Sequence, residues 1–405
     1  MKILVQKFGG TSVESNDKIK EVCKIIKSYK DNDKDLGIVV VVSAMGRKGA
    51  PYATDTLIGL FNEVKDKPQK RELDMLMSCG EIISGTILAN MLQSSGLDSI
   101  FLTGMQAGII TNGNFSDARI RDVDPSRVLK ELESNKIVVI AGFQGGTADG
   151  EITTLGRGGS DTSAVAIGKA LGCDTVEIYT DVDGIMTADP RIEPDAKVLK
   201  YINYEEVFEM AEKGAKVIHP RAVELAKSGS ITLAIKNTLN PSCEGTKIGL
   251  ESNNNHLFKY EEEKHGMMAV AHKDKLCQVK IKSAECVFIN ILNKIEENHI
   301  SIDMINFFIG EKAFVIDENE LEKLEKILKE YYVEYEINRD CAKVTLIESR
   351  ITGTPGVMAK IVRALSKEDI QLLQTSDSSM TISCLVSKEN MIKTVHAIHN
   401  AFRIE

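Results

Sequence analysis

Up to about residue 248, short apolar runs alternate with segments whose apolar residues recur at helical spacing. The runs IVVVVSA (38–44) and IVVIAGF (137–143) are too uniformly apolar to have a face in water, and helical spacing appears at 71–94 and 161–171. Strands buried on both faces and separated by helices are typical of a mainly parallel sheet. We therefore predict an α/β catalytic domain over residues 1–248.

The pattern changes after this region. ESNNNH, at 251–256, has turn composition without apolar periodicity and predicts a linker over residues 249–263. Beyond it, two units of similar length show strands and helices in the same order. We predict two consecutive ferredoxin-like βαββαβ modules, over residues 264–340 and 341–405.

Composition narrows the class of protein. The chain has 405 residues, a net charge of -9, and eight cysteines that form no C-x-x-C pair, so we expect reduced thiols and no zinc ribbon. A negative net charge argues against non-specific nucleic-acid binding. No uninterrupted apolar run approaches the roughly 18 residues of a membrane span, and no secretory leader is recognised. We expect a cytoplasmic protein that acts on small molecules, away from membranes.

The first predicted strand leads into KFGGTS, residues 7–12. Its glycines let backbone N–H groups approach an anion, Lys7 adds a positive charge, and Thr11 and Ser12 can donate hydrogen bonds. The P-loop pattern G-x-x-x-x-G-K-[ST] is absent. A Gly-Gly turn beside a solvated lysine is the alternative interpretation.

A second glycine-rich stretch, TTLGRGGSDTSA at 153–164, leads into a predicted helix. The amides of the helix start can bind an anion, and Arg157 can grip a carboxylate in bidentate fashion. Asp161 is a candidate for organising this site, or simply the N-cap of the helix.

Two later motifs add charged groups. YTDVDGIMTADPR, at 179–191, predicts a nucleotide-contacting loop; the calcium-loop pattern fails because Ile192 stands at its twelfth position. GAKVIHPRA, at 214–222, offers Lys216, whereas His219 before a proline is typical of a turn or cap. Glu81, in SCGE, lies in an apolar helix, where it either occupies an exposed turn or accepts a ligand ammonium.

These motifs, with the strand end VVSAMG and in this order, closely resemble the aspartate kinases of the amino-acid kinase family. The resemblance covers essentially the whole chain, including two carboxy-terminal modules of the ACT type. AMGRKGAPYATD and NRDCAKV look most like the monofunctional isozymes of Gram-positive bacteria. The resemblance implies an α/β sandwich and the transfer of phosphate from ATP to the side-chain carboxylate of L-aspartate. That reaction gives 4-phospho-L-aspartate, the first step toward lysine, threonine, methionine and diaminopimelate.

The resemblance also implies roles for individual residues. It places the nucleotide at Lys7, Gly9, Gly10, Ser43, Thr180, Asp181, Met186, Arg191 and Lys216. It places aspartate at Thr11, Ser12, Glu81, Arg157, Gly158, Gly159 and Ser160, with Glu81 at the amino group and Arg157 at the α-carboxylate. Lys7, Asp161 and Lys216 would be catalytic. Mg²⁺ would be carried mainly by the ATP phosphates, without a metal site of the protein's own.

The ACT resemblance further implies a homodimer, or a dimer of dimers, that binds an amino-acid effector: lysine, threonine or diaminopimelate. The candidate effector residues are Gly356, Val357, Ser376 and Asp377. The modules would otherwise be only a dimerisation platform. Glu348, Ser349 and Arg350 replace the small residues of many relatives, which leaves the effector open.

Two other functions fit parts of the pattern. A kinase acting on acetylglutamate or glutamate should lack the TADPR run and the paired modules. A non-catalytic amino-acid sensor should have lost a charge among Lys7, Arg157, Asp161 and Lys216, and all four are present.

Overall fold

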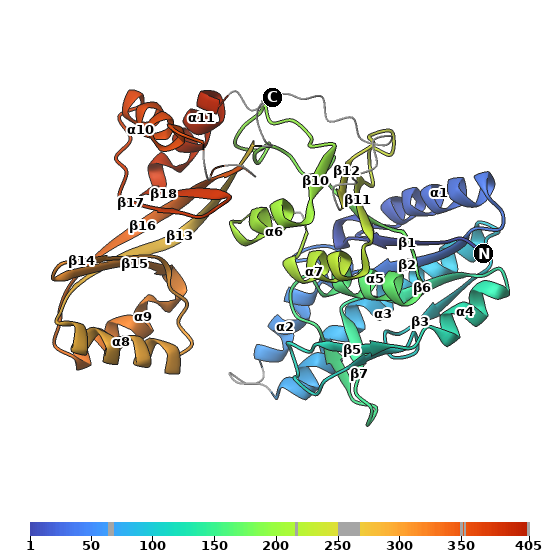
Figure 1. Ribbon diagram of the computed structural model, residues 1–405. Helices are drawn as coiled ribbons and strands as arrows, with labels where there is room; N and C mark the ends of the chain where they lie inside the picture. The colour runs from blue at the N-terminus through green and yellow to red at the C-terminus, as the bar shows by residue number, and fades with distance from the viewer. Residues whose placement is uncertain (64–68, 215–217, 250–267, 349–350, 352–353, 403–405) are drawn as a thin grey trace. The chain divides into compact units, whose positions relative to one another are not determined.

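The structure is a computed structural model that describes residues 1–63, 69–214, 218–249, 268–348, 351 and 354–402 (Figure 1). The chain forms two compact units. The first contains the described residues up to 249 except Met186–Lys197 and 212–214. The second contains those two segments and the described residues from 268 to 402. The units therefore differ from a simple division at residue 248, because part of the TADPR region packs with the carboxy-terminal half.

The first unit is built on an eight-stranded sheet, as the buried apolar runs predict. All of its strand pairs are parallel except the pair of β11 with β12. In spatial order the strands are β10 (Tyr201–Asn203), β12 (Thr246–Gly249), β11 (Thr232–Asn237), β9 (Thr175–Thr180), β1 (Ile3–Phe8), β2 (Gly37–Val42), β6 (Ile137–Ala141) and β3 (Ser99–Leu102). Every residue of β2 and β6 is buried, so this sheet has helices on both faces.

Apolar side chains of α1 (Asn16–Asn32) and α3 (Lys70–Ser94) share one core with β1, β2 and β6. The helix α5 (Gly159–Ala170) packs against β1, β9 and β2. By length and composition α3 is apolar enough to cross a membrane, but ten of its residues are buried in the described part of this unit. The remaining helices are α2 (Thr54–Asn62), α4 (Ser126–Glu133), α6 (Tyr204–Glu212) and α7 (Pro220–Gly229).

A smaller sheet, which the sequence did not predict, supports the glycine-rich segment at 156–159. It has the order β5 (Ile120–Val123), β4 (Ile109–Thr111), β7 (Gln144–Gly146) and β8 (Ile152–Thr154). Three of these strands have only three residues, too few for a two-residue periodicity to be recognised. Because β8 ends at Thr154, it delivers the chain directly into the glycine-rich segment.

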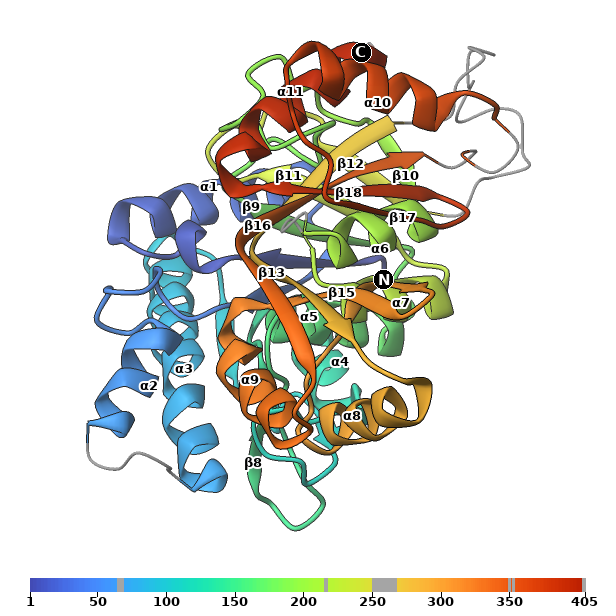
Figure 2. The same ribbon diagram turned by 90° about the vertical axis from the view of Figure 1, so that its left-hand side faces the viewer.

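In the second unit, two ACT-like modules are nested rather than consecutive. The strands β13 (Met268–Lys282) and β16 (Glu334–Glu348) run side by side through both modules (Figures 1 and 2). The first half of β13, at 268–273, pairs with the last part of β16, at 343–348, and β18 (Thr381–Ser387) extends this end. The sequence division at 340/341 therefore falls inside one continuous strand, and the missing last strand of the second module comes from the start of β13.

The two modules have separate cores. In the inner module, whose core lies within residues 277–337, α8 (Glu285–Glu297) and α9 (Leu321–Glu330) pack over β13 and β15 (Glu311–Asp317). In the outer module, whose core includes Val270 and residues from 344 to 402, α10 (Val357–Lys367) and α11 (Met391–Phe402) pack over β16 and β18. The edges of the six-stranded sheet are β14 (Asp303–Phe308), next to β15 (Glu311–Asp317), and β17 (Gln374–Asp377). Ala188 and Ala196 are buried in the core of the outer module.

Candidate active site

Lys7 and Asp161 form a buried ion pair at the carboxyl end of β1. Alternation along β1 sends Phe8 into the core on the α1 side, so its neighbour Lys7 faces α5. The Nζ atom of Lys7 lies 2.7 Å from Oδ1 of Asp161, and each residue is only 9% exposed. The interpretation of Lys7 as a solvated lysine is therefore wrong.

Asp161 is not the N-cap of its helix. That position is Gly158, and no side chain caps the start of α5. Asp161 instead lies in the first turn, where Ser160 is also buried. A helix start without a side-chain cap leaves backbone N–H groups for a ligand anion, and the helix dipole favours negative charge there.

The segment after β1 approaches the end of β2 very closely. The N–H of Gly46 donates to the Gly10 carbonyl at 2.9 Å, and the N–H of Ser43 donates to that of Phe8 at 3.1 Å. A Cβ atom at Gly10 would lie 2.7 Å from the carbonyl oxygens of Ala44 and Gly46. Only glycine permits this approach, which places Gly10 beside the residues that follow β2; the nucleotide contacts of Gly9, Gly10 and Ser43 stay predictions.

The hydroxyls of this segment differ in their surroundings. Ser12 is buried, and its Oγ lies 2.7 Å from Oγ1 of Thr238, just beyond β11. Ser12 therefore fastens the segment to a distant strand. Thr11 is partly exposed and stays a predicted substrate contact.

Glu81 is buried in α3 and only 2% exposed, so the interpretation as an exposed turn is wrong. Its Oε1 atom accepts a hydrogen bond of 2.9 Å from the N–H of Ala44, at the end of β2. Its Oε2 atom is buried and has no partner among the described residues. Burial raises the pKa of the Glu81 carboxyl to about 8. An unpaired buried acceptor of this kind suits a ligand ammonium.

The glycines of the GRGG segment are required by geometry. Gly158 has a φ of 67°, and a Cβ atom on it would lie 2.1 Å from Cβ of His219. A Cβ atom on Gly159 would lie 2.8 Å from the ring of Phe143. Arg157 directly precedes Gly158; it is exposed and pairs with no acid in the part of the chain that the structure describes. Its guanidinium is therefore available to a ligand.

The first turn of α7 supports the same segment. His219 is the N-cap of α7 and accepts a hydrogen bond from the N–H of Arg221 through Nδ1, so its predicted cap role is confirmed. Arg221 donates to the carbonyl of Leu155 at 2.9 Å and to Asp117 at 2.6 Å. Arg221 was not identified from the sequence, because both partners are more than sixty residues away.

At the end of β9, Thr180 and Asp181 lie beside β1, since β9 and β1 are neighbouring parallel strands. Asp181 pairs with Arg47 at 2.6 Å. Asp183 accepts hydrogen bonds from Asn237 and Asn240, so this loop is fixed to the end of β11. Arg47 and the two asparagines were not identified from the sequence. The carboxyl edge of a parallel sheet is the usual place for a ligand in an α/β fold.

Three further residues were predicted to contact the nucleotide. Lys216 lies outside the described residues. Met186 and Arg191 belong to the second unit, where Arg191 forms a bidentate pair with Asp189. The Arg191 guanidinium lowers the pKa of Asp189. Their contacts with a nucleotide stay predictions.

The candidate effector residues lie in the outer ACT-like module. Gly356 has a φ of 87° and begins α10 without a side-chain cap, followed by the buried Val357. Ser376 and Asp377 lie on the edge strand β17. Ser349 and Arg350 lie outside the described residues. An effector at these positions stays a prediction.

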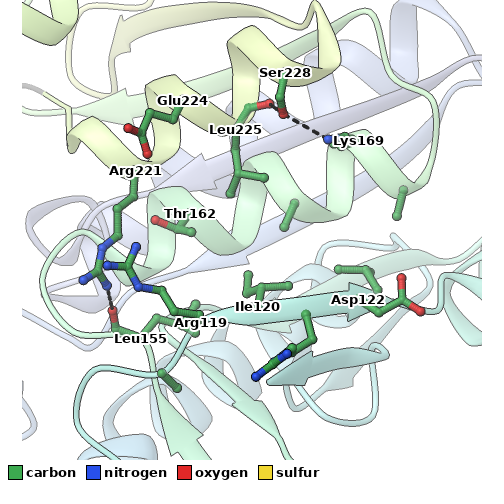
Figure 3. Close-up of a pocket in the computed structure, with 15 residues that line it drawn as sticks. Arg119, Ile120, Asp122, Leu155, Thr162, Lys169, Arg221, Glu224, Leu225 and Ser228 are labelled. Carbon is green, nitrogen blue, oxygen red and sulfur yellow. Dashed lines mark hydrogen bonds between the residues drawn. The ribbon is translucent and has the colours of Figure 1, made fainter. Parts of the chain in front are cut away.

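A cavity of about 660 Å³ lies on the side of α5 that carries Thr162 and Lys169 (Figure 3). Its other walls come from β5 and α7, and Lys169 donates a hydrogen bond to Ser228 across it. Neither Lys7, Asp161 nor Glu81 lines this cavity. It is therefore separate from the site at the strand ends.

A mainly parallel sheet with a buried lysine at its carboxyl edge and an uncapped helix start, in a chain without the P-loop motif, fits a phosphotransferase of the amino-acid kinase type. Residues 2–237 match the model of the amino acid kinase family, and residues 336–400 match an ACT domain. The chain is 40% identical to aspartokinase 1 of Bacillus subtilis (strain 168) and 34% identical to an aspartokinase of Thermus thermophilus, in both cases over 100% of both chains. It belongs to the aspartokinase family.

Two solved structures support the fold. The aspartate kinase of Clostridium acetobutylicum, described as an allosteric enzyme, is similar with a TM-score of 0.79 at 26% identity, covering 98% of this chain and 100% of that one. E. coli aspartokinase III, solved with aspartate and ADP, gives a TM-score of 0.80 at 23% identity, covering 99% and 100%. The predicted amino-acid kinase fold with carboxy-terminal ACT modules is confirmed.

Proposed function

We propose that this aspartokinase transfers the γ-phosphoryl group of ATP to the side-chain carboxylate of L-aspartate, giving 4-phospho-L-aspartate and ADP. The observation that carries the proposal is the buried Lys7–Asp161 pair beside the uncapped start of α5. Full-length similarity to curated aspartokinases supports the choice of aspartate as the acceptor.

The chemistry explains why the site needs cations rather than a general base. The aspartate carboxylate is already a nucleophile, so the obstacle is the repulsion between an anion and a polyanion. Lys7 would neutralise charge on the transferred phosphoryl group, and Asp161 would hold the Lys7 ammonium in place. Lys216 would approach the phosphates from the other side.

Substrate recognition would use groups on two different elements. The free Oε2 atom of Glu81 would accept from the aspartate ammonium, and the exposed guanidinium of Arg157 would bind the α-carboxylate. Gly158, Gly159 and Ser160 would lie along the bound molecule. Two fixed contacts orient the reacting carboxylate toward the γ-phosphate.

Mg²⁺ would accompany the nucleotide and reduce the charge of its phosphates. Among the described residues, no three His, Cys, Asp or Glu side chains gather as a metal site. Phosphate and water oxygens are ligands that Mg²⁺ accepts readily. We therefore assign the ion to ATP, with Thr180 and Asp181 contacting the nucleotide itself.

We further propose a cytoplasmic homodimer, or a dimer of dimers, regulated through its ACT modules by lysine, threonine or diaminopimelate. The allosteric character of the Clostridium acetobutylicum enzyme supports regulation. All eight cysteines are free in the structure, which suits a reducing compartment. The product would enter the biosynthesis of lysine, threonine, methionine and diaminopimelate.

The test is ADP release by the purified protein with Mg²⁺ and ATP and one acceptor at a time: aspartate, glutamate or acetylglutamate. We expect hydroxylamine-trapped product with aspartate and at least about tenfold lower kcat/KM with glutamate, because one extra methylene displaces the reacting carboxylate. Equal or better turnover of glutamate would reject the assignment. Repeating the assay with each amino-acid effector identifies the regulator.

A further inference from the structure

Asp74 is a buried acid that neither the sequence motifs nor the proposed chemistry uses. It lies in α3 and is 0% exposed. Its Oδ2 atom accepts from the backbone N–H groups of Ser116 and Thr154, at 2.9 and 2.8 Å. Its Oδ1 atom accepts from the hydroxyls of the same two residues, at 3.0 and 2.9 Å. Four donors satisfy the four lone-pair positions of the carboxylate.

The position of these contacts links the two elements proposed to hold aspartate. Glu81 follows Asp74 by seven residues, close to two helical turns, so both side chains leave α3 on the same side. Thr154 ends β8 and precedes Arg157 by three residues. The Asp74 carboxylate therefore links α3, which carries Glu81, to the end of β8, which leads into the segment that carries Arg157.

A second set of contacts, from Arg221 of α7, holds the same end of β8 in place. Asp117, next to Ser116, pairs with Arg221 of α7, and Arg221 also donates to the carbonyl of Leu155. The N–H of Ala118 donates to the Thr154 carbonyl. Residues 116–118 and 154–155 are thus linked to one another and are here called the block. Four hydrogen bonds of Asp74 link this block to α3.

We propose that Asp74 is a positioning residue for aspartate recognition, because it sets the separation between Glu81 and Arg157. This inference rests on the proposed function of those two residues. The ammonium and the α-carboxylate of an amino acid are attached to one carbon, so their protein partners must keep a nearly fixed distance. ATP binding has no such requirement on this block.

The side-chain chemistry gives a test that separates positioning from simple stability. Asp74→Asn can keep one oxygen toward the two backbone N–H groups and turn its amide toward the hydroxyls of Ser116 and Thr154, which can accept as well as donate. Asp74→Ala leaves both N–H groups buried without a partner. Only the second variant should detach the block.

We would measure KM for aspartate and for ATP, and kcat, for both variants and for Ser99→Ala. Ser99 of β3 is buried and donates to the Ala89 carbonyl of α3, so Ser99→Ala removes one buried hydrogen bond to α3 away from the site. We expect Asp74→Ala to raise KM for aspartate at least about tenfold, with KM for ATP within about threefold. Asp74→Asn and Ser99→Ala should leave both constants within about threefold.

If Asp74→Ala does not fold, the double variant Ser116→Ala with Thr154→Val takes its place, with the same selective rise in KM expected. An equal change in both KM values, or an unchanged KM for aspartate in a folded variant, overturns the inference while wild-type turnover stands. Absence of aspartate turnover by the wild-type protein would count against the proposed function instead.

Discussion

At the scale of the residue, the groups that could be identified from the sequence are those whose chemistry is unusual for their position. Lys7, close to Gly9 and Gly10, and Glu81, inside an apolar helix, were both identified. A charged group in an apolar element is costly unless it is paired or binds a ligand. Asp74 was not, because its partners are 42 and 80 residues away along the chain. A hydrogen-bond acceptor satisfied by distant residues leaves no local pattern.

If Glu81 binds the aspartate ammonium as proposed, its raised pKa should make aspartate affinity depend on pH. With a pKa of about 8, Glu81 is mostly protonated at pH 6, and a proton must leave when a ligand ammonium binds. We expect aspartate affinity to rise between about pH 6 and 8, by up to about tenfold per pH unit, and to level off above. Calorimetric titrations in buffers of different ionisation enthalpy measure the released proton.

The same pKa has the opposite effect on the stability of the ligand-free protein. An acid whose pKa rises from 4.5 to about 8 on folding contributes stability that is complete below 4.5 and is lost as the pH rises to about 8. Glu81→Gln should flatten both profiles. Unchanged pH profiles in that variant would show that another group titrates.

At the scale of the element, long strands and helices were predictable and short or exchanged strands were not. The strands at 38–44 and 137–143 and the helix at 71–94 correspond to β2, β6 and α3. The four short strands beside the glycine-rich segment have too few residues for a periodicity. The exchange of the first half of β13 into the outer module depends on strand pairing, which a repeat in the sequence does not specify.

The glycine-rich segment allows a matched test of its geometry. Gly158 and Gly172 have nearly the same φ, 67° and 66°, but a Cβ atom on Gly172 meets nothing within 4 Å. Gly172→Ala should therefore cost only about 1–2 kcal/mol of unfolding free energy, from the left-handed backbone. Gly158→Ala adds a clash with His219 and should displace the start of α5.

For Gly158→Ala we expect a larger loss of stability than for Gly172→Ala and a fall of at least about tenfold in kcat/KM for aspartate. Thermal unfolding and steady-state kinetics of the two variants decide this. Equal behaviour of the two would mean that the contact with His219 does not hold the segment in place.

At the scale of the whole molecule, the two units hold different functional groups. The first unit holds the candidate catalytic residues Lys7 and Asp161. In the second, Met186–Lys197 is fixed to the outer module, where Oε2 of Glu193 lies 2.8 Å from Nδ1 of His396 and Oγ1 of Thr187 lies 3.2 Å from Nε2 of His399. The sequence could not predict that this segment packs against the outer module, because its motif is typical of a nucleotide-contacting loop.

The edge strand β14 is the surface we expect to form the dimer. Ile305, Phe307 and Phe308 are all exposed on it, and an unpaired apolar edge favours pairing with a second copy. Ile305→Lys should convert a dimer into monomers in light-scattering measurements. Ile289→Lys, at an even more exposed apolar position on α8, should not. A monomeric wild-type protein would contradict this assignment.

The most direct test of the central claim, that cationic groups let a carboxylate meet a triphosphate, is the kinetics of Lys7→Ala beside Lys2→Ala. Lys2 precedes the same strand but is exposed. We predict that Lys7→Ala lowers kcat by at least about a hundredfold and changes KM for aspartate by less than about threefold, with Lys2→Ala close to wild type. A large rise in KM at unchanged kcat would contradict the charge-neutralising role of Lys7.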